Sequence, residues 1–248
     1  MNMPATADSV LPARDRVQHY WKGLHVPIIA TWSHETVIHP QVIRASYRGV
    51  WGIGYIDELE VADRRHGALW VRRAVARGKG VPALAGVHPM RQRQAMGHLL
   101  CQVCGNSTFD EHWQLWGERH LFLMRALEPG QVISEGETTD SPPVCLSCAL
   151  ESVETCPHIR QGWTAALVKD ARPWGVAGVL HDPATLQPEM SPQKRLIERP
   201  FGHEEYAWIN AARELVQLEG VTPVGLHELD AEARSAGIKI TIASTDGG

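Results

Sequence analysis

The chain has 248 residues with a formal net charge of −4, and 44% of its residues are hydrophobic. This length is enough to bury a core as one large domain or as two small ones. No apolar run is long enough to span a bilayer, and the negative net charge is unfavourable for a dedicated nucleic-acid-binding protein.

The first part of the chain is expected to be rich in strands. Apolar and aromatic runs predict strands over residues 26–32, 50–56 and 68–71. Gly52 and Gly54 interrupt the second of these runs. They indicate a bulge or a close backbone approach, because the third glycine and the helix that a dinucleotide site requires do not follow them.

Basic residues are concentrated after these strands. Residues 64–100 contain eight Lys or Arg and no acidic residue, whereas residues 105–155 contain nine acidic residues and two arginines. A basic face attracts a charged partner such as nucleic acid. The candidate nucleic-acid-binding residues are Arg72, Arg73, Arg91 and Arg93. The alternative is that the basic and acidic segments face and neutralise each other.

Two pairs of cysteines form the most informative pattern in the sequence. Cys101 and Cys104 are separated from Cys145 and Cys148 by 40 residues, and two residues lie inside each pair. Four thiolates in two such turns are the ligand set of a tetrahedral zinc site, with Zn–S bonds of about 2.3 Å. Because four cysteines leave no coordination position for a substrate, we expect the zinc to be structural.

The segments around the cysteine pairs also have recognisable patterns. Pro89 opens a predicted helix over residues 90–100, which leads into the first pair. Strands are predicted over 112–116 and 120–127, joined by a turn at 117–119. A second helix is expected to begin at the second pair, so that Cys145 and Cys148 share its first turn.

A cysteine pair, a hairpin and a helix that supplies the last two ligands resemble the treble-clef class of zinc modules over residues 89–158. This resemblance implies a metal site and no particular activity. The same segment also resembles the zinc scaffold of HNH-type nucleases, which implies a histidine base near the hairpin. The nearest match is His112, preceded by Asp110 and Glu111. Ala149 stands where many members have a histidine, so the catalytic residues of that family are not matched.

The residues 88–93, the cysteine pairs and Cys156-Pro157-His158 also resemble short actinobacterial proteins of unassigned activity, a resemblance that implies no reaction. Cys156 lies about 12 Å beyond Cys148 along a continuous helix, at about 1.5 Å per residue. We therefore expect a free thiol at Cys156 and not a further ligand. The odd number of cysteines argues against a disulfide framework, while an iron–sulfur cluster remains an alternative to zinc.

The last third of the chain is expected to combine strands and helices. Strands are predicted over 164–168, 175–180, 195–201 and 238–242, and helices over 204–218 and 226–236. The predicted fold class is α+β, strand-rich, with a central treble-clef-like module and a C-terminal strand–helix region. A boundary near residue 160 would divide the chain into residues 1–160 and 161–248, which can also pack as one domain.

These observations favour a cytoplasmic protein, because cysteines used as metal ligands require a reducing compartment. We expect it to act by binding nucleic acid or a protein partner through the basic segment. The alternative is an enzyme with a small-molecule pocket and a purely structural zinc. A concave pocket lined by tryptophan and histidine would favour the enzyme, and an exposed row of arginines would favour the binding protein.

Overall fold

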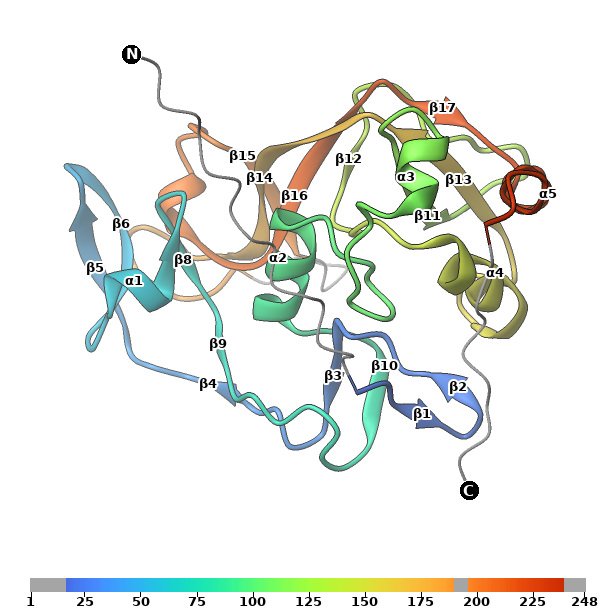
Figure 1. Cartoon of the computed structure of the whole chain (residues 1–248). Helices are drawn as coiled ribbons and strands as arrows, with labels where there is room; N and C mark the ends of the chain where they lie inside the picture. The colour runs from blue at the N-terminus through green and yellow to red at the C-terminus, as the bar shows by residue number, and fades with distance from the viewer. Residues whose placement is uncertain (1–16, 190–195, 239–248) are drawn as a thin grey trace, which may run out of the picture.

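The computed structural model describes residues 17–189 and 196–238 (Figure 1). They form a mixed α+β fold in which strands predominate and are divided among several small sheets, as the sequence predicts. Of the predicted strand over 238–242, residues 239–242 lie outside the described residues. No helix in the described part of the chain has the length and apolar character needed to cross a membrane.

The largest sheet has six strands, which come from both sides of residue 160. They are β7 (Arg64–Arg65), β8 (Ala68–Trp70), β12 (Thr138–Thr139), β14 (Asp170–Leu180), β15 (Ile197–Pro200) and β16 (Ile209–Glu219). The main order is β15-β14-β16-β8-β7, and β12 pairs with β16. The long strands β14 and β16 are antiparallel, whereas β8 runs parallel to β16. This sheet therefore joins the two predicted regions through backbone hydrogen bonds.

The predicted helix over residues 204–218 is wrong. The segment forms a short 3-10 turn, η1 (Tyr206–Trp208), and then strand β16. Its apolar residues fit a helical spacing, but Ile209 and Ala211 also alternate, and both are buried in the sheet core. β16 pairs with β14 along most of its length, with β8 at Asn210 and Ala211, and with β12 at Val216 and Gln217, and such tertiary pairing overrides local helix propensity.

A second sheet has three antiparallel strands, β11 (His120–Arg125), β13 (Trp163–Val168) and β17 (Thr222–Pro223). Side chains that alternate along β11 enter two different cores. Leu121 and Leu123 pack with the cysteines and with two helices, α4 (Leu146–Thr155) and α5 (Leu226–Ser235). Phe122 packs on the opposite face with Val216 and Leu218 of β16. The predicted strands at 120–127 and 164–168 and the helix at 226–236 are confirmed.

The N-terminal part consists of short two-stranded pairs: β1 (Tyr20–Trp21) with β2 (Leu24–His25), β3 (Ala30–Trp32) with β10 (Pro82–Val87), β4 (Val37–Ile38) with β9 (Arg72–Arg73), and β5 (Val42–Tyr47) with β6 (Val50–Tyr55). Three hairpins turn at Lys22-Gly23, Arg48-Gly49 and His66-Gly67, where both residues have a positive φ. Two consecutive positive φ values define the type I′ turn, whose twist matches that of the flanking strands.

Two short helices complete the fold, α1 (Glu60–Asp63) and α3 (Glu111–Leu115). The predicted strand over 112–116 is wrong, because α3 occupies this segment. The carboxylate of Asp110 accepts hydrogen bonds from the backbone N–H groups of His112 and Trp113. An aspartate in this position caps a helix and favours it over a strand. Without the second strand, the predicted hairpin is absent, and β11 pairs instead with β13.

Helix α2 (Pro89–Gly97) crosses the centre of the molecule (Figure 1). Gln92 is fully buried, and its amide makes three hydrogen bonds, to the carbonyl oxygens of Asp140 and Glu214 and from the N–H of Glu214. These bonds attach the helix to β16. The helix predicted over residues 90–100 is confirmed as far as Gly97, and three residues then lead to the first cysteine pair.

Candidate metal centre

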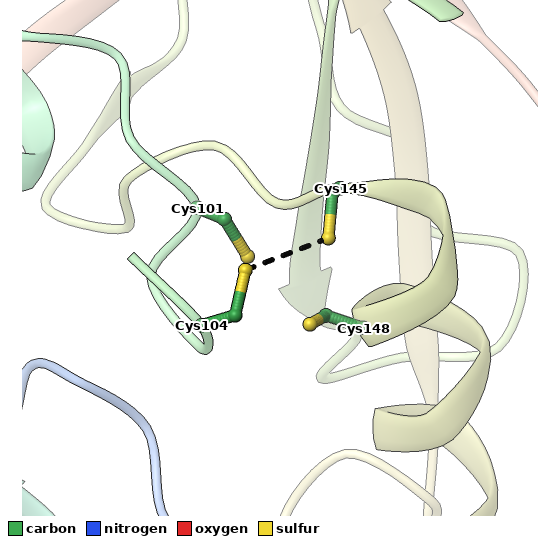
Figure 2. A group of neighbouring side chains, drawn as sticks. All are labelled: Cys101, Cys104, Cys145 and Cys148. Atoms are coloured by element: carbon green, nitrogen blue, oxygen red, sulfur yellow. Dashed lines mark hydrogen bonds between the residues drawn. The ribbon is translucent and has the colours of Figure 1, made fainter. Parts of the chain in front are cut away.

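The four cysteines of the two pairs come together in one cluster (Figure 2). The sulfur atoms of Cys101, Cys104, Cys145 and Cys148 all lie within 4.8 Å of one another. The Sγ atoms of Cys104 and Cys145 are 3.8 Å apart. This spacing allows all four sulfurs to reach one ion, so the cluster is able to hold a metal ion such as zinc.

The first pair lies in a tight turn after α2. The N–H of Gly105 donates to the carbonyl of Cys101, and the N–H of Cys101 donates to the carbonyl of Asn106. Gly105 has a φ of +78°, a conformation that glycine adopts without a Cβ clash. The turn therefore directs both sulfurs of the pair toward the same side, as Figure 2 shows.

The second pair opens helix α4. Cys145 is the N-cap residue and Cys148 lies in the first turn, as the sequence predicts. Gln102, inside the first pair, connects the two halves of the site. Its N–H donates to the carbonyl of Pro143, and its side-chain amide donates to the carbonyl of Pro142. The fold thus holds the two pairs in position through backbone groups.

The surroundings of the sulfurs favour a cation. Cys101, Cys104 and Cys148 are buried. Burial raises the pKa of the Cys101 thiol, and hydrogen bonds with Cys104 and Cys145 add to this shift. Four neighbouring thiolates repel one another and require a compensating charge, which a divalent ion supplies. Because the ligand set is complete, such an ion would have no open position for a reacting substrate.

The N-terminal hairpin β1–β2 packs on the metal centre, which the sequence did not indicate. The amide of Gln18 donates to the carbonyl of Cys104. The Nδ1 atom of His25 lies 3.0 Å from Glu151 Oε2, and a ligand atom of each lies within 4.8 Å of the sulfur of Cys148. Polar groups next to metal ligands orient them. His25 and Glu151 thus form, with Cys148, a second group of possible ligands that shares one cysteine with the cluster.

His112 pairs with the carboxylate of Asp110. Its Nδ1 atom lies 3.5 Å from Asp110 Oδ2, and this hydrogen bond raises the pKa of His112. Among the described residues, no group of potential metal ligands includes Asp110, Glu111 or His112. The residues expected from the HNH resemblance are therefore not assembled into a second metal site here.

Cys156 ends helix α4 as its C-cap residue and does not belong to the four-cysteine cluster. All five cysteines are free, without a disulfide. This position is the one expected from the length of the helix. The apparent Cys156-Pro157-His158 motif marks a helix end.

The four predicted nucleic-acid-binding arginines do not form an exposed row. Arg91 is only 7% exposed, and its guanidinium binds the carboxylate of Glu35 with an Nη1–Oε1 distance of 2.6 Å. Arg72 is neutralised by Asp63 and Asp57. These acidic partners precede the basic segment, so the acidic residues 105–155 do not neutralise Arg72 and Arg91.

A buried histidine next to the metal centre should make stability depend on pH. His120 is 4% exposed, and burial lowers its pKa to about 4. The hydroxyl of Thr108 donates to the carbonyl of Leu99, so its oxygen accepts the Nδ1–H of His120. The neutral imidazole is therefore the form that the fold accommodates.

The unfolded chain binds a proton at this residue below about pH 6.5, and the native state does so only near pH 4. The contribution to stability is thus complete above pH 6.5 and falls as the pH decreases to 4. The loss is about 3 kcal/mol at most. His120→Asn keeps a donor for Thr108. We expect it to reduce the difference between the free energies of unfolding that denaturant melts give at pH 7 and at pH 5. The control is His98→Asn, at an exposed histidine, and an unchanged pH profile in His120→Asn would contradict the prediction.

A cavity of about 920 Å³ lies away from the cysteines. It is bordered by the tips of the β5–β6 and β7–β8 hairpins and by residues 201–207. Its walls include Tyr47, His66, Phe201 and Tyr206, none of which the sequence marked as functional. They come from segments far apart in the chain and share no motif, so only a resemblance to a known protein could have indicated them.

No family model matches this chain, and comparisons with curated proteins and with solved structures also give no match. Its function has therefore to be inferred from the side chains themselves.

Proposed function

We propose that this protein binds a small molecule and that a structural zinc ion in the four-cysteine centre maintains its fold. The observation that carries the proposal is the cavity of about 920 Å³. Its volume is within the range of about 300–1,000 Å³ that is usual for small-molecule sites. None of the four cysteines lines it, so the metal ion would support the structure without contacting the ligand.

The walls of the cavity favour a ligand with a flat ring. The rings of His66 and Phe201 have centroids 5.2 Å apart, and those of Phe201 and Tyr206 are 5.6 Å apart. Aromatic walls of this kind bury a planar apolar group and stack against it. The backbone also approaches closely, because a Cβ on Gly52 would clash with the carbonyl oxygen of Ala207. Gly52 is therefore needed to place the hairpin against this wall.

The charged groups at the cavity include one exposed cation that an acidic ligand can reach, and the exposed carboxylate of Glu204 also lines the cavity. Arg64 is neutralised by Glu58, and Arg65 pairs with the buried carboxylate of Glu214. Arg48 is different, because its side chain is 78% exposed and its contact with Glu60 is long, at 3.9 Å. The preferred ligand is thus an aromatic acid, with its ring packed against the cluster of His66, Phe201 and Tyr206 and its anionic group near Arg48.

The ion pairs of the basic segment favour a small-molecule site over a nucleic-acid-binding surface. A nucleic-acid surface gains its affinity from several exposed cations that contact phosphates. The burial of Arg91 and the neutralisation of Arg72 leave few such cations in the basic segment. Binding of an aromatic ligand in the cavity does not depend on such exposed cations.

The cavity is tested with 1-anilinonaphthalene-8-sulfonate, a fluorescent aromatic anion. We expect saturable binding of one dye per chain to the folded protein. Phe201→Ala removes a wall and its two ring contacts, and should weaken binding about tenfold, or about 1.4 kcal/mol. The matched control is Phe109→Ala, because Phe109 also makes two ring contacts, with Trp113 and His120, and does not line the cavity.

Equal dye affinity in the wild type and in Phe201→Ala would contradict the proposed site, provided that thermal melts show both proteins folded. A gel shift with duplex DNA at about 50 mM salt tests the competing function, because phosphate contacts are least screened there. Tight DNA binding together with no dye binding would replace the small-molecule proposal.

A further inference from the structure

A second pocket, of about 380 Å³, lies beside the first turn of helix α2. It shares no lining residue with the aromatic cavity. Its walls include Trp70, Arg72, Arg73, His88 and Arg93. Three arginines around one small pocket create a positive potential unless carboxylates compensate for it. Their ion pairs therefore decide what this pocket can bind.

Two of the three arginines have no carboxylate partner. Arg72 is neutralised by Asp63 and Asp57. Arg73 donates to the backbone carbonyl of Glu35, and the guanidinium of Arg93 lies 4.5 Å from the centre of the Trp70 ring. Neither arginine forms an ion pair with any residue that the structure describes. Asp63 also lines the pocket, and three arginines set against Asp63 and Asp57 leave about one net positive charge there.

Several buried polar atoms at this pocket also have no partner. They are Nε of Arg73, Nη1 of Arg93, Nε1 of Trp70 and Nδ1 of His88. Trp70 is 3% exposed and His88 is 1% exposed, and both line the pocket. Buried polar groups are almost always hydrogen-bonded in native proteins. Because all four atoms are shielded from solvent, a polar ligand completes them only when the side chains turn toward the pocket.

The start of α2 adds to the attraction for an anion. The helix begins at Pro89, and His88 provides no side-chain cap. The first turn of a helix leaves backbone N–H groups without internal partners, and the positive end of the helix dipole lies there. Pro89 and Met90 of this turn line the pocket. Helix starts combined with arginines bind phosphate groups in many proteins.

We propose that this pocket binds a phosphate group, either as free phosphate or as part of a small phosphorylated molecule. Arg73 and Arg93 supply the charge and donate to its oxygens, and the first turn of α2 faces it. The pocket is larger than one phosphate ion needs. Ile38 and Leu59 line it as well and are 49% and 67% exposed, so they provide an apolar rim for an attached organic group.

His88 defines which oxyanion fits best. Its Nε2 lies 3.2 Å from the carbonyl oxygen of Ala74, which can only accept, so Nε2 carries the hydrogen. Burial lowers the pKa of His88, as does the nearby charge of Arg91, and the imidazole is neutral. Its free Nδ1 is therefore an acceptor. When the imidazole turns so that Nδ1 faces the pocket, an anion that retains an O–H satisfies this acceptor, whereas sulfate does not.

The probes are inorganic phosphate, sulfate and phenyl phosphate, titrated calorimetrically at about pH 6, where phosphate monoesters are about half protonated. Chloride keeps the ionic strength constant. We expect one phosphate per chain, and sulfate should bind about tenfold more weakly or worse. Phenyl phosphate binding more tightly than phosphate identifies a phosphorylated small molecule as the ligand, and the reverse order identifies free phosphate. If phenyl phosphate binds more tightly, Leu59→Ala should weaken the binding of phenyl phosphate and leave that of inorganic phosphate unchanged.

Arg93→Met keeps an apolar side chain over Trp70 and removes the charge. It should reduce phosphate affinity about tenfold or more, while the melting temperature without phosphate stays equal or rises, because a poorly compensated buried charge is removed. Arg93→Gln provides a second variant. The control is Arg125→Met, which removes the same charge from an exposed position. Absence of phosphate binding, equal binding of sulfate, or wild-type affinity in both Arg93 variants would each overturn the proposal.

Discussion

Cys145→Ser should release the metal ion and unfold the part of the protein around it. Structural zinc contributes about 10–16 kcal/mol in zinc-finger peptides, whereas a whole domain is stable by only about 5–15 kcal/mol. The cysteines share one hydrophobic core with Leu121 of β11, Leu146 of α4 and Leu226 of α5. Loss of the metal would therefore destabilise the contact between the three-stranded sheet and both helices.

The measurement is zinc content by elemental analysis, together with thermal melts in the presence and absence of a strong chelator. We expect one zinc per chain in the wild type and a large decrease in melting temperature on chelation. Cys156→Ser is the matched control, because this cysteine ends α4 outside the cluster. It should retain the zinc and melt like the wild type. A wild-type protein that holds iron, or that folds fully without metal, would contradict the assignment.

Glu35→Gln should be the most damaging change outside the metal centre. The side chain of Glu35 is fully buried and binds both terminal nitrogens of Arg91, at 2.6 and 2.7 Å. It also accepts from the backbone N–H groups of Trp32 and Ala76. Removing one partner of a buried ion pair leaves an uncompensated charge, which costs about 3–5 kcal/mol. Denaturant melts of the variant measure this loss.

The same pair should contribute to acid sensitivity. Burial alone would raise the pKa of Glu35, but hydrogen bonds from Arg91 and from the backbone of Trp32 and Ala76 outweigh it and lower the pKa. A carboxylate with a lowered folded pKa stabilises the protein above its unfolded pKa of about 4.5, and this contribution is lost as the pH falls through the folded value. In Glu35→Gln, the decrease in stability below about pH 4.5 should be smaller than in the wild type.

Arg172→Met is the control for this pair. Arg172 contacts Asp170 and Glu219 at 3.0 Å, but its side chain is 63% exposed. Exposed ion pairs contribute about 0–1 kcal/mol. If Glu35→Gln cost no more than Arg172→Met, the buried pair would not have the role that its hydrogen bonds indicate.

Patterns that depend on short-range spacing could be predicted correctly from the sequence. The two cysteine pairs indicated the ligands of the metal centre, because a turn with two intervening residues places both sulfurs on one side. Helix α2 was found from its initial proline and α5 from its apolar spacing. Strand β6 was recognisable by its apolar and aromatic residues, bounded by turn residues.

Predictions failed where a distant segment decided the outcome. The spacing of residues 204–218 allowed a helix or a strand, and β14 and β8 provide the neighbours that make β16 a strand. A strand was predicted over 112–116, but the helix cap at Asp110 makes this segment helical. Arg91 was expected on the surface because arginine is usually exposed. Its burial depends on Glu35, which is 56 residues away in the sequence.

The two pockets could not be predicted for the same reason. Tyr47 and Phe201, or Arg73 and Arg93, share no local pattern, and the chain folds them together through long-range strand pairing. The sequence by itself determined which four cysteines cluster into a possible metal site, and the elements that carry strong local signals. The tertiary structure decided which charges are neutralised and which cavities form, because both depend on contacts between residues far apart in the chain.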